Sequence, residues 1–183
     1  MDATGLESRH TSTYFATRSG RATRPWTKLT AAVDTRSHFI AGATVTTGPA
    51  NDSPQFRPVL AQASLAVAWD RVLADAAFDA EAHHAYARQE LGIRSSVIPV
   101  NARGHDGPPG GVYRQQMARR FVPKPEGSRH RQVFGQRWQA ESAFSRHKRR
   151  LGSALSGRSD GSRERECRLR VLTHDLMLLA ATG

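Results

Sequence analysis

The stretch Phe134–Gly152 reads FGQRWQAESAFSRHKRRLG and does the most to decide the fold. In an α-helix each residue turns the chain by about 100°, so side chains three, four and seven residues apart share a face. One face of a helix over this stretch would carry Phe134, Arg137, Glu141, Ser145 and Lys148. A carboxylate is then flanked by an Arg and a Lys. Two interpretations stay open: an amphipathic helix stabilised by charge pairs, or a functional face.

The segments on either side of this stretch predict alternating strands and helices. Residues 28–35 and 38–47 are rich in β-forming side chains and are joined by a short polar turn, which indicates an antiparallel hairpin. Further strands are expected at 71–74 and at 95–100. Apolar spacing and terminal signals predict helices at 53–67, 80–91, 112–121, about 130–151 and about 163–180.

Particular residues are expected at the ends of these elements. Ser53 and Asp79 are the expected N-caps of the two helices that follow them, and Gly92 is expected to end the second helix. Asp75 directly follows the strand at 71–74. Trp138 is expected in the core of the protein.

Length and composition indicate a single globular domain that spans residues 1–183. A chain of 183 residues with 38% hydrophobic residues can bury a core of ordinary size. Glycines and prolines gather at 46–54 and 104–110, which marks loops. We expect residues 104–128 to form an internal flexible connection.

Basic residues are concentrated in the C-terminal part of the chain. The formal net charge is +11, as expected for a protein that meets a polyanion. Residues 1–100 contain 10 basic and 9 acidic side chains, whereas residues 101–183 contain 17 and 7. Most of the basic residues are arginines, which suits phosphate contacts but is equally typical of a GC-rich genome. A surface for nucleic acid is therefore expected in the C-terminal part.

Several other classes of protein are disfavoured by the sequence. The single Cys167 cannot form an internal disulfide, and no apolar run approaches the roughly 20 residues of a membrane span. We therefore expect a reduced, cytoplasmic protein without membrane contacts. His83 and His84 are adjacent rather than four residues apart, and no second Cys is present, so we expect no zinc site.

The stretch quoted first resembles the tyrosine-arginine-glutamate-lysine signature of bacterial DDE transposases of the insertion-sequence-4-like group. That signature is spaced Y-x2-R-x3-E-x6-K, and its four positions hold Phe134, Arg137, Glu141 and Lys148. Phe134 keeps the ring of the family's Tyr but lacks its hydroxyl. Two further segments match in order. Residues 1–15 resemble the first-aspartate motif, and VLADAAFDAEAHH at 72–84 resembles the second.

This resemblance implies a ribonuclease-H-like α/β fold with a mixed sheet and a helical C-terminal part. It also implies that Asp2, Asp75 and Glu141 are the catalytic residues and the ligands of two Mg²⁺ or Mn²⁺ ions, which prefer oxygen ligands. The implied activity is cleavage and strand transfer at transposon ends, by in-line attack of water or a 3′-hydroxyl at phosphorus. The partners would be transposon-end and target DNA, with a possible homodimer in the synaptic complex.

Contacts with DNA are expected around the quoted stretch. The resemblance assigns Phe134, Arg137 and Lys148 to them. Arg146, Arg149 and Arg150 lie beside the predicted face and are expected to follow the phosphate backbone, although a solvated basic face is the plainer alternative.

Asp2 stands at the very start of the sequence. The resemblance implies that Asp2 ends the first strand, and that most of this strand and the usual N-terminal DNA-binding region are lacking. We therefore expect marginal stability and little strand transfer. The rival hypotheses are a truncated, inactive transposase remnant that only binds DNA, and a small basic RNA- or ribosome-associated protein. Three other acids, Asp34, Asp70 and Asp79, have structural explanations near turns or caps.

Overall fold

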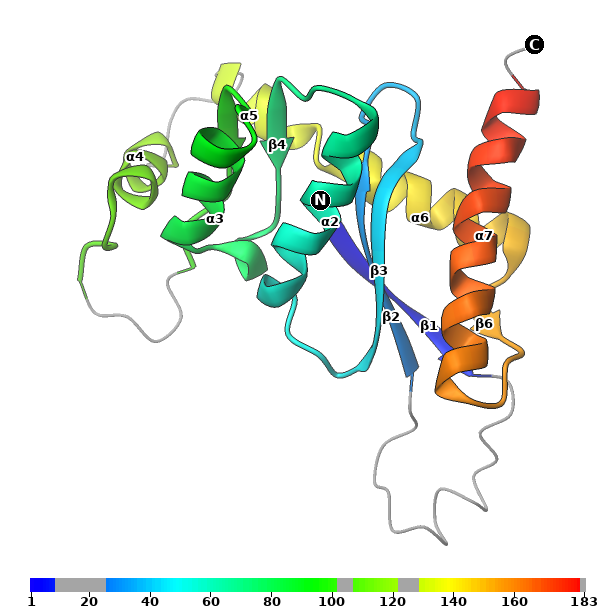
Figure 1. Cartoon of the computed structure of the whole chain (residues 1–183). Coiled ribbons are helices and arrows are strands. Elements are labelled where there is room, and N and C mark those ends of the chain that lie inside the picture. The colour runs from blue at the N-terminus through cyan, green and yellow to red at the C-terminus, as the bar shows by residue number, and fades with distance from the viewer. Residues whose placement is uncertain (9–25, 102–106, 122–128, 182–183) are drawn as a thin grey trace, which may run out of the picture.

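The structure is a computed structural model that describes residues 1–8, 26–101, 107–121 and 129–181 (Figure 1). Its strands are β1 (Asp2–Ser8), β2 (Trp26–Val33), β3 (Ile40–Gly48), β4 (Arg71–Leu73), β5 (Ser95–Val97) and β6 (Ala154–Leu155). Its α-helices are α2 (Phe56–Ala66), α3 (Glu81–Ala85), α4 (Val112–Arg120), α5 (Arg129–Gly135), α6 (Trp138–Leu151) and α7 (Asp160–Ala180). Shorter turns are the 3-10 helices η1 (Ser53–Gln55) and η2 (Ala76–Phe78) and the π-helical η3 (Tyr86–Glu90).

A mixed four-stranded sheet forms the centre of the fold, in the order β3-β2-β1-β6. β1 and β3 both run antiparallel to β2, and β6 runs parallel to β1. β4 and β5 form a separate parallel pair. Helices accompany both sheets, and the C-terminal part is helical (Figure 1). The predicted α/β class with a mixed sheet is therefore confirmed, as expected for a ribonuclease-H-like domain.

The predicted hairpin is β2 and β3, which pair from Trp26 opposite Gly48 to Val33 opposite Ile40. The polar turn between them is held by Asp34, whose carboxylate accepts hydrogen bonds from the amide and the hydroxyl of Ser37. This is the structural role expected for that acid. Asp34 therefore belongs to the turn and lies outside the candidate site.

Alternation along β2 places its buried apolar side chains in two clusters, on opposite faces of the sheet, and a third cluster around Leu73, Val97 and Met117 lies beside β4 and β5. Leu29 and Ala31 face α6 and α7, whereas Ala32 faces α2, because successive side chains of a strand point to opposite faces. The first cluster is completed by Leu6, Ile40, Phe144, Leu155 and Cys167. The second includes Met1, Phe56, Val59, Leu60, Ala63, Val72, Ala74, Phe78, Ala87, Ile93 and Ile98. The helices α6 and α7 and the helix α2 thus cover opposite faces of the sheet.

The backbone of α2 approaches β3 closely at Gly42. A Cβ atom at this position would lie 2.3 Å from the carbonyl oxygen of Val59 and 2.9 Å from the amide nitrogen of Ala63. Only a glycine fits such an approach. The absence of this one side chain lets α2 pack directly on the sheet.

The expectation that Asp2 ends the first strand is wrong. β1 is a seven-residue strand that Asp2 begins rather than ends, and it lies between β2 and β6. Residues Asp2–Leu6 pair with β2, and Glu7 and Ser8 pair with β6. DATGLES has little apolar character, so the strand forms because its backbone groups find partners on both sides and because Leu6 is fully buried. β1 is therefore paired with β2 over most of its length, and with β6 only at its last two residues.

The predicted helix at 130–151 is divided in two. α5 ends at Gly135 and α6 begins at Trp138, and between them the amides of Gln136, Arg137 and Gln139 bond to carbonyls three residues earlier. Such bonds tighten the backbone into a 3-10 turn, and the low helix propensity of glycine favours the break. The side chains from Phe134 to Lys148 therefore do not share one continuous helical face.

Two cap predictions and one core prediction are wrong. Ser53 is the first residue of η1 rather than a cap, and Ala80 holds the N-cap position of α3 where Asp79 was expected. Asp79 has a partner elsewhere, described below. Trp138 is 56% exposed, because it begins α6 on the side away from the sheet. By contrast, Gly92 follows the end of η3 with a φ of 67°, so its predicted role as a helix stop is confirmed.

Other predicted elements are confirmed with small shifts of their ends. The short strands at 71–73 and 95–97 and the helices at 112–120 and 160–180 lie where the sequence placed them. α4 falls inside the predicted flexible connection at 104–128, while 104–106 and 122–128 lie outside the described residues. In the described part of the chain, no helix is both long and apolar enough to cross a membrane.

Candidate active site

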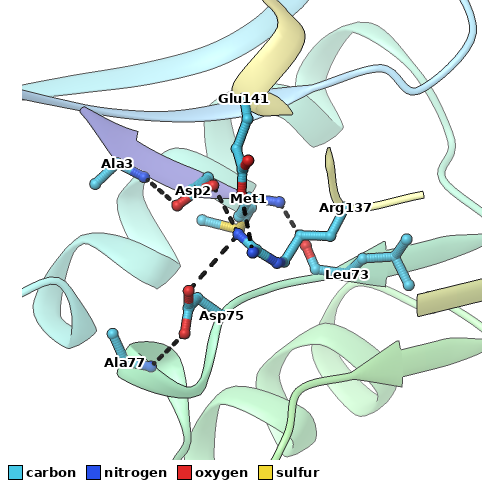
Figure 2. A network of polar contacts seen from close by, with 8 residues as sticks. All are labelled: Met1, Asp2, Ala3, Leu73, Asp75, Ala77, Arg137 and Glu141. Carbon is cyan, nitrogen blue, oxygen red and sulfur yellow. Dashed lines mark hydrogen bonds and ion pairs between the residues drawn. The ribbon is translucent and has the colours of Figure 1, made fainter. Parts of the chain in front are cut away.

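Three carboxylates from distant segments converge on one arginine (Figure 2). Asp2 comes from the start of β1, and Glu141 from the first turn of α6. Asp75 lies two residues after the end of β4, directly before η2. Arg137 lies in the turn between α5 and α6. All three acids that the resemblance assigned to catalysis therefore lie together. We call these four residues the Arg137 cluster.

The guanidinium of Arg137 contacts each carboxylate at a single oxygen. Its Nη1 lies 2.8 Å from Oδ2 of Asp2 and 3.6 Å from Oδ2 of Asp75. Its Nη2 lies 2.9 Å from Oε1 of Glu141. The side chains of Asp75 and Glu141 are 45% and 59% exposed, whereas that of Asp2 is 15% exposed. The cluster is thus open to solvent on the side of Asp75 and Glu141 and closed on the side of Asp2.

Local backbone contacts hold the two aspartates in place. The carboxylate of Asp2 accepts a hydrogen bond from the amide of Ala3, at 2.9 Å. Asp75 is the N-cap of η2, and its Oδ1 accepts from the amide of Ala77 at 3.4 Å. The amino group of Met1 donates to the carbonyl of Leu73, which ties the start of β1 to β4 (Figure 2). This contact brings Asp2, at the start of β1, close to Asp75, which follows β4.

Burial makes the Asp2 side of the cluster costly to charge. Burial is the main cause that raises the pKa of Asp2 above its usual value, and the nearby Asp75 carboxylate raises this pKa further. The Ala3 amide and the charges of Arg137 and Met1 act in the opposite direction without cancelling this effect. Burial likewise lowers the pKa of the Met1 amino group to about 6, against the attraction of Asp2. The Asp2 carboxyl is therefore protonated more readily than an exposed aspartate.

A pocket of about 220 Å³ opens beside the two aspartates. Its wall on one side is Asp2, Asp75 and the turn that follows Asp75. On the other side stand Trp26 and Lys28 of β2, with Asp52. The carboxylates thus face a space that can admit part of a ligand.

The donor set of the Arg137 cluster is chemically suited to a hard divalent cation. Mg²⁺ and Mn²⁺ prefer carboxylate oxygens, and three such groups are presented here by separate elements. Their present spacing is set by Arg137, which reaches all three. Among the residues that the structure describes, no three acidic, His or Cys side chains are grouped closely enough to hold one metal ion.

The residues predicted to contact DNA lie in different environments. Phe134 is half-buried and packs edge-on against Phe121, with ring centroids 5.1 Å apart. Arg137 directs its guanidinium into the carboxylates. Lys148 and Arg146 are partly exposed on α6, and Arg149 and Arg150 near its end are exposed. Only the α6 cations are therefore turned toward solvent in this arrangement.

Two ion pairs near the site were missed by the sequence-based reasoning. Lys28 of β2 lies 2.6 Å from Asp52 and donates to the carbonyl of Ala50. The pocket is therefore lined by a cation from the N-terminal half of the chain, where basic and acidic residues are nearly equal in number. Arg114 of α4 pairs with Asp79. For the first pair, Lys28 lies in β2 and Asp52 just before η1, and no local pattern connects them. For the second, 35 residues separate the partners and no local pattern connects them.

Comparison with known proteins gives one match. The sequence profile of the family described as transposase DDE domain matches residues 1–176. That range includes all four residues of the Arg137 cluster. No curated protein and no solved structure matches the chain.

Proposed function

The chain belongs to the transposase DDE domain family, and we propose that it binds transposon-end DNA and catalyses metal-dependent DNA cleavage and strand transfer. The observation that carries this proposal is the convergence of Asp2, Asp75 and Glu141 from three distant segments. A purely structural charge pair needs one carboxylate for one arginine. Three carboxylates around a single guanidinium leave the site with excess negative charge, as a site for divalent cations requires.

Transposases of this family generally use divalent metal ions, and for this chain we propose two Mg²⁺ or Mn²⁺ ions. Asp2, Asp75 and Glu141 would hold them through their carboxylate oxygens. Bound ions would activate the attacking hydroxyl and neutralise charge on the scissile phosphate and the leaving oxygen. The ions so held would lie among the start of β1, the turn after β4 and the first turn of α6, where these three carboxylates stand.

The basic face of α6 supports binding of the DNA backbone. Lys148 follows Glu141 by seven residues, which is about 10 Å along a helix and on the same face. Arg149 lies beside this face, about 80° round the helix from Glu141, whereas Arg146 and Arg150 lie on the far side of α6 and could reach DNA only where it curves round the helix. A duplex that lies along α6 would bring a phosphate to Glu141 while these cations contact its neighbours. The assignment of Phe134 and Arg137 to DNA contacts, and that of the chain to the insertion-sequence-4-like group, stay predictions.

A homodimer in the synaptic complex is part of the proposal, and α7 offers a surface for it. Leu169, Leu172 and Leu176 are 54–63% exposed and form one apolar stripe, at the alternating spacing of three and four residues that is typical of helix–helix seams. Exposed Arg165 continues this stripe toward the start of α7. In an antiparallel pair, it would face the negative C-terminal end of the other copy's helix, whereas a parallel pair would oppose two arginines.

Sedimentation of the purified chain tests this part of the proposal. The parent chain should sediment as a dimer, and Leu172→Glu should make it monomeric. Leu65→Glu is the matched control, because Leu65 is 90% exposed on α2 and lies outside the stripe. A parent chain that stays monomeric at high concentration, or a Leu172→Glu variant that still dimerises, would exclude α7 as the interface.

The competing proposal is an inactive transposase remnant that only binds DNA in the bacterial cytoplasm. One observation favours it: Arg137 occupies the centre of the carboxylates. A labelled duplex taken from the ends of the chain's own element separates the two. An active enzyme should nick it only when Mg²⁺ or Mn²⁺ is present. Asp75→Asn and Glu141→Gln should keep binding and lose nicking.

Asp70→Asn serves as the control for these variants. Asp70 is also an exposed acid with an arginine partner, Arg94 at 2.7 Å, but lies outside the Arg137 cluster. It should nick at the parental rate. A chain that binds the duplex but nicks with neither metal would establish the remnant. A chain that neither binds nor nicks would exclude both proposals.

A further inference from the structure

Arg137 already provides a cation at the centre of the proposed catalytic acids (Figure 2). Its two terminal nitrogens reach Asp2, Asp75 and Glu141 at 2.8, 3.6 and 2.9 Å. These contacts use one oxygen of each carboxylate and direct it toward the guanidinium. The same oxygens would have to turn toward a divalent ion for the site to be loaded. The two cations therefore compete for one set of ligands.

The contacts of Arg137 are suited to exchange. A permanent arginine–carboxylate pair is typically bidentate and shielded from water. Here each carboxylate receives a single contact, and two of the three acids are about half exposed. Water screens the charges of exposed ion pairs, so each such contact contributes little to stability. If the guanidinium leaves, Asp75 and Glu141 stay in contact with water, and the more buried Asp2 keeps the amide of Ala3 as a hydrogen-bond donor.

The backbone around Arg137 also permits movement of its side chain. Arg137 lies in the 3-10 turn between α5 and α6, next to Gly135, and not inside a continuous helix. Its side chain is 22% exposed, so it touches solvent in its present position. A rotation about its side-chain bonds carries the guanidinium outward without breaking a backbone hydrogen bond of α6. The helix that holds Glu141 would stay in place.

We propose that Arg137 acts as an internal counter-ion that holds the three carboxylates together and must withdraw before divalent metal can bind. This inference rests on the proposed function, because it takes the Arg137 cluster as the metal site. It assigns Arg137 a positioning role in the free protein. On this proposal, the Arg137 guanidinium contacts either the carboxylates or a DNA phosphate, but not both at once. Metal binding is then coupled to a change of partner by Arg137.

The alternative is that Arg137 stays in place and supports the carboxylates while metal binds beside it. The two ideas predict opposite effects of removing the guanidinium. If Arg137 competes with metal, its removal frees the ligands and tightens metal binding. If it supports the ligands, its removal leaves three repelling carboxylates unrestrained and weakens metal binding.

Calorimetric titration of the full chain with Mn²⁺ alone, without DNA and at fixed ionic strength, measures this directly. Arg137→Gln should bind Mn²⁺ at least tenfold more tightly than the parent. Arg168→Gln is the matched control: Arg168 also pairs with a glutamate four residues away, Glu164 at 2.8 Å, and the variant has the same net charge. It should change the affinity by less than twofold. Equal or weaker binding by Arg137→Gln would overturn the proposal.

Two further variants separate the possible failures. Arg137→Lys keeps the charge but not the planar fork, and should give an intermediate affinity. Asp75→Asn should abolish the tight binding of Arg137→Gln when the two are combined, which places the bound Mn²⁺ in the cluster. If neither the parent nor Arg137→Gln binds Mn²⁺, the proposed metal site itself is wrong. If the parent and Arg137→Gln bind Mn²⁺ with equal affinity, the metal site is supported and the proposed role of Arg137 is wrong.

Thermal unfolding followed by circular dichroism provides a second measurement should Arg137→Gln fold poorly. Without metal, the melting temperature of Arg137→Gln should lie below that of the parent, because three carboxylates are left to repel one another. Addition of Mn²⁺ should raise the melting temperature of Arg137→Gln more than that of the parent. A larger rise in the parent would contradict competition between the two cations.

Discussion

Two arginines in this protein bind carboxylates in opposite ways. Arg114 and Asp79 form a bidentate pair with contacts of 2.9 and 2.7 Å, and the side chain of Asp79 is 1% exposed. Asp79 also accepts a hydrogen bond from the amide of Asn101. Glu81 completes this group by accepting from the amides of Tyr113 and Arg114 at the start of α4. We call Asp79, Glu81 and Arg114 the Arg114 cluster.

The two clusters differ in how completely their carboxylates are neutralised. In the Arg114 cluster, each carboxylate oxygen has a defined donor, and the group joins α4 to the segment around α3. In the Arg137 cluster, one guanidinium makes single contacts to three acids, so negative charge is in excess, although the second oxygens of Asp2 and Asp75 accept from the amides of Ala3 and Ala77. A satisfied pair stabilises a fold, whereas an under-neutralised group of acids attracts a ligand. Arginine–carboxylate contacts therefore need to be compared by geometry and burial, not by number.

The largest expected effect comes from breaking the closed cluster. Asp79→Ala should reduce the free energy of unfolding by about 3–5 kcal/mol, because it leaves the Arg114 guanidinium partly buried without its partner. Urea denaturation followed by circular dichroism measures the loss. A change below about 1 kcal/mol would mean that the Arg114 cluster contributes no more than a surface pair.

A smaller effect on stability is expected from pH, through His84 beside the Arg114 cluster. Burial lowers the pKa of His84 to about 4 from 6.5, although Glu81 and Asp79 oppose the shift, so protonation favours the unfolded chain. His84 thus contributes stability fully above pH 6.5 and loses it as pH falls toward 4. The loss should be about 2–3 kcal/mol.

Urea denaturation at a series of pH values should show this loss in the parent and a smaller one in His84→Gln. The amide can keep the hydrogen bond that the His84 ring makes with Ser96, at 2.7 Å, without titrating. Other buried histidines titrate in both chains, so the difference between the two curves isolates His84. Identical curves would show that His84 does not resist protonation in the folded protein.

The open cluster should contribute less to stability than the closed one. Arg137→Gln should reduce the free energy of unfolding by about 1 kcal/mol or less in the absence of metal, since two of its three partners are about half exposed. Added salt should shrink this difference further by screening the charges. Parallel urea titrations at low and high salt test it. A loss as large as that of Asp79→Ala would remove the distinction between the two clusters.

The smallest expected effect concerns the basic face that continues from the open cluster along α6. Lys148→Ala should flatten the slope of log affinity for DNA against log salt concentration by about one unit, as expected on losing one phosphate contact. Arg94→Ala is the control, because Arg94 pairs with Asp70 away from α6. Fluorescence anisotropy at several salt concentrations gives both slopes. Equal slopes for Lys148→Ala and the parent would place the DNA elsewhere.

Local features of the fold could be predicted from the sequence because they depend on neighbouring residues. The hairpin of β2 and β3, the strand before Asp75 and the helix stop at Gly92 follow from alternation, turn residues and glycine conformation. The three acids were found through their resemblance to a family signature, and their order along the chain agrees with it. Each of these signals lies within a short stretch of sequence.

Charges that are distant in the sequence were brought together by the tertiary structure. Arg137 and Asp2 are 135 residues apart, and Arg114 and Asp79 are 35 apart, so no local pattern could pair them. The same holds for β1, a weakly apolar segment that becomes a central strand because β2 and β6 supply its backbone partners. The chemical groups and the local elements follow from the amino-acid sequence. Only packing determined that one guanidinium would stand between all three acids, because contacts between distant segments exist only once the chain is folded.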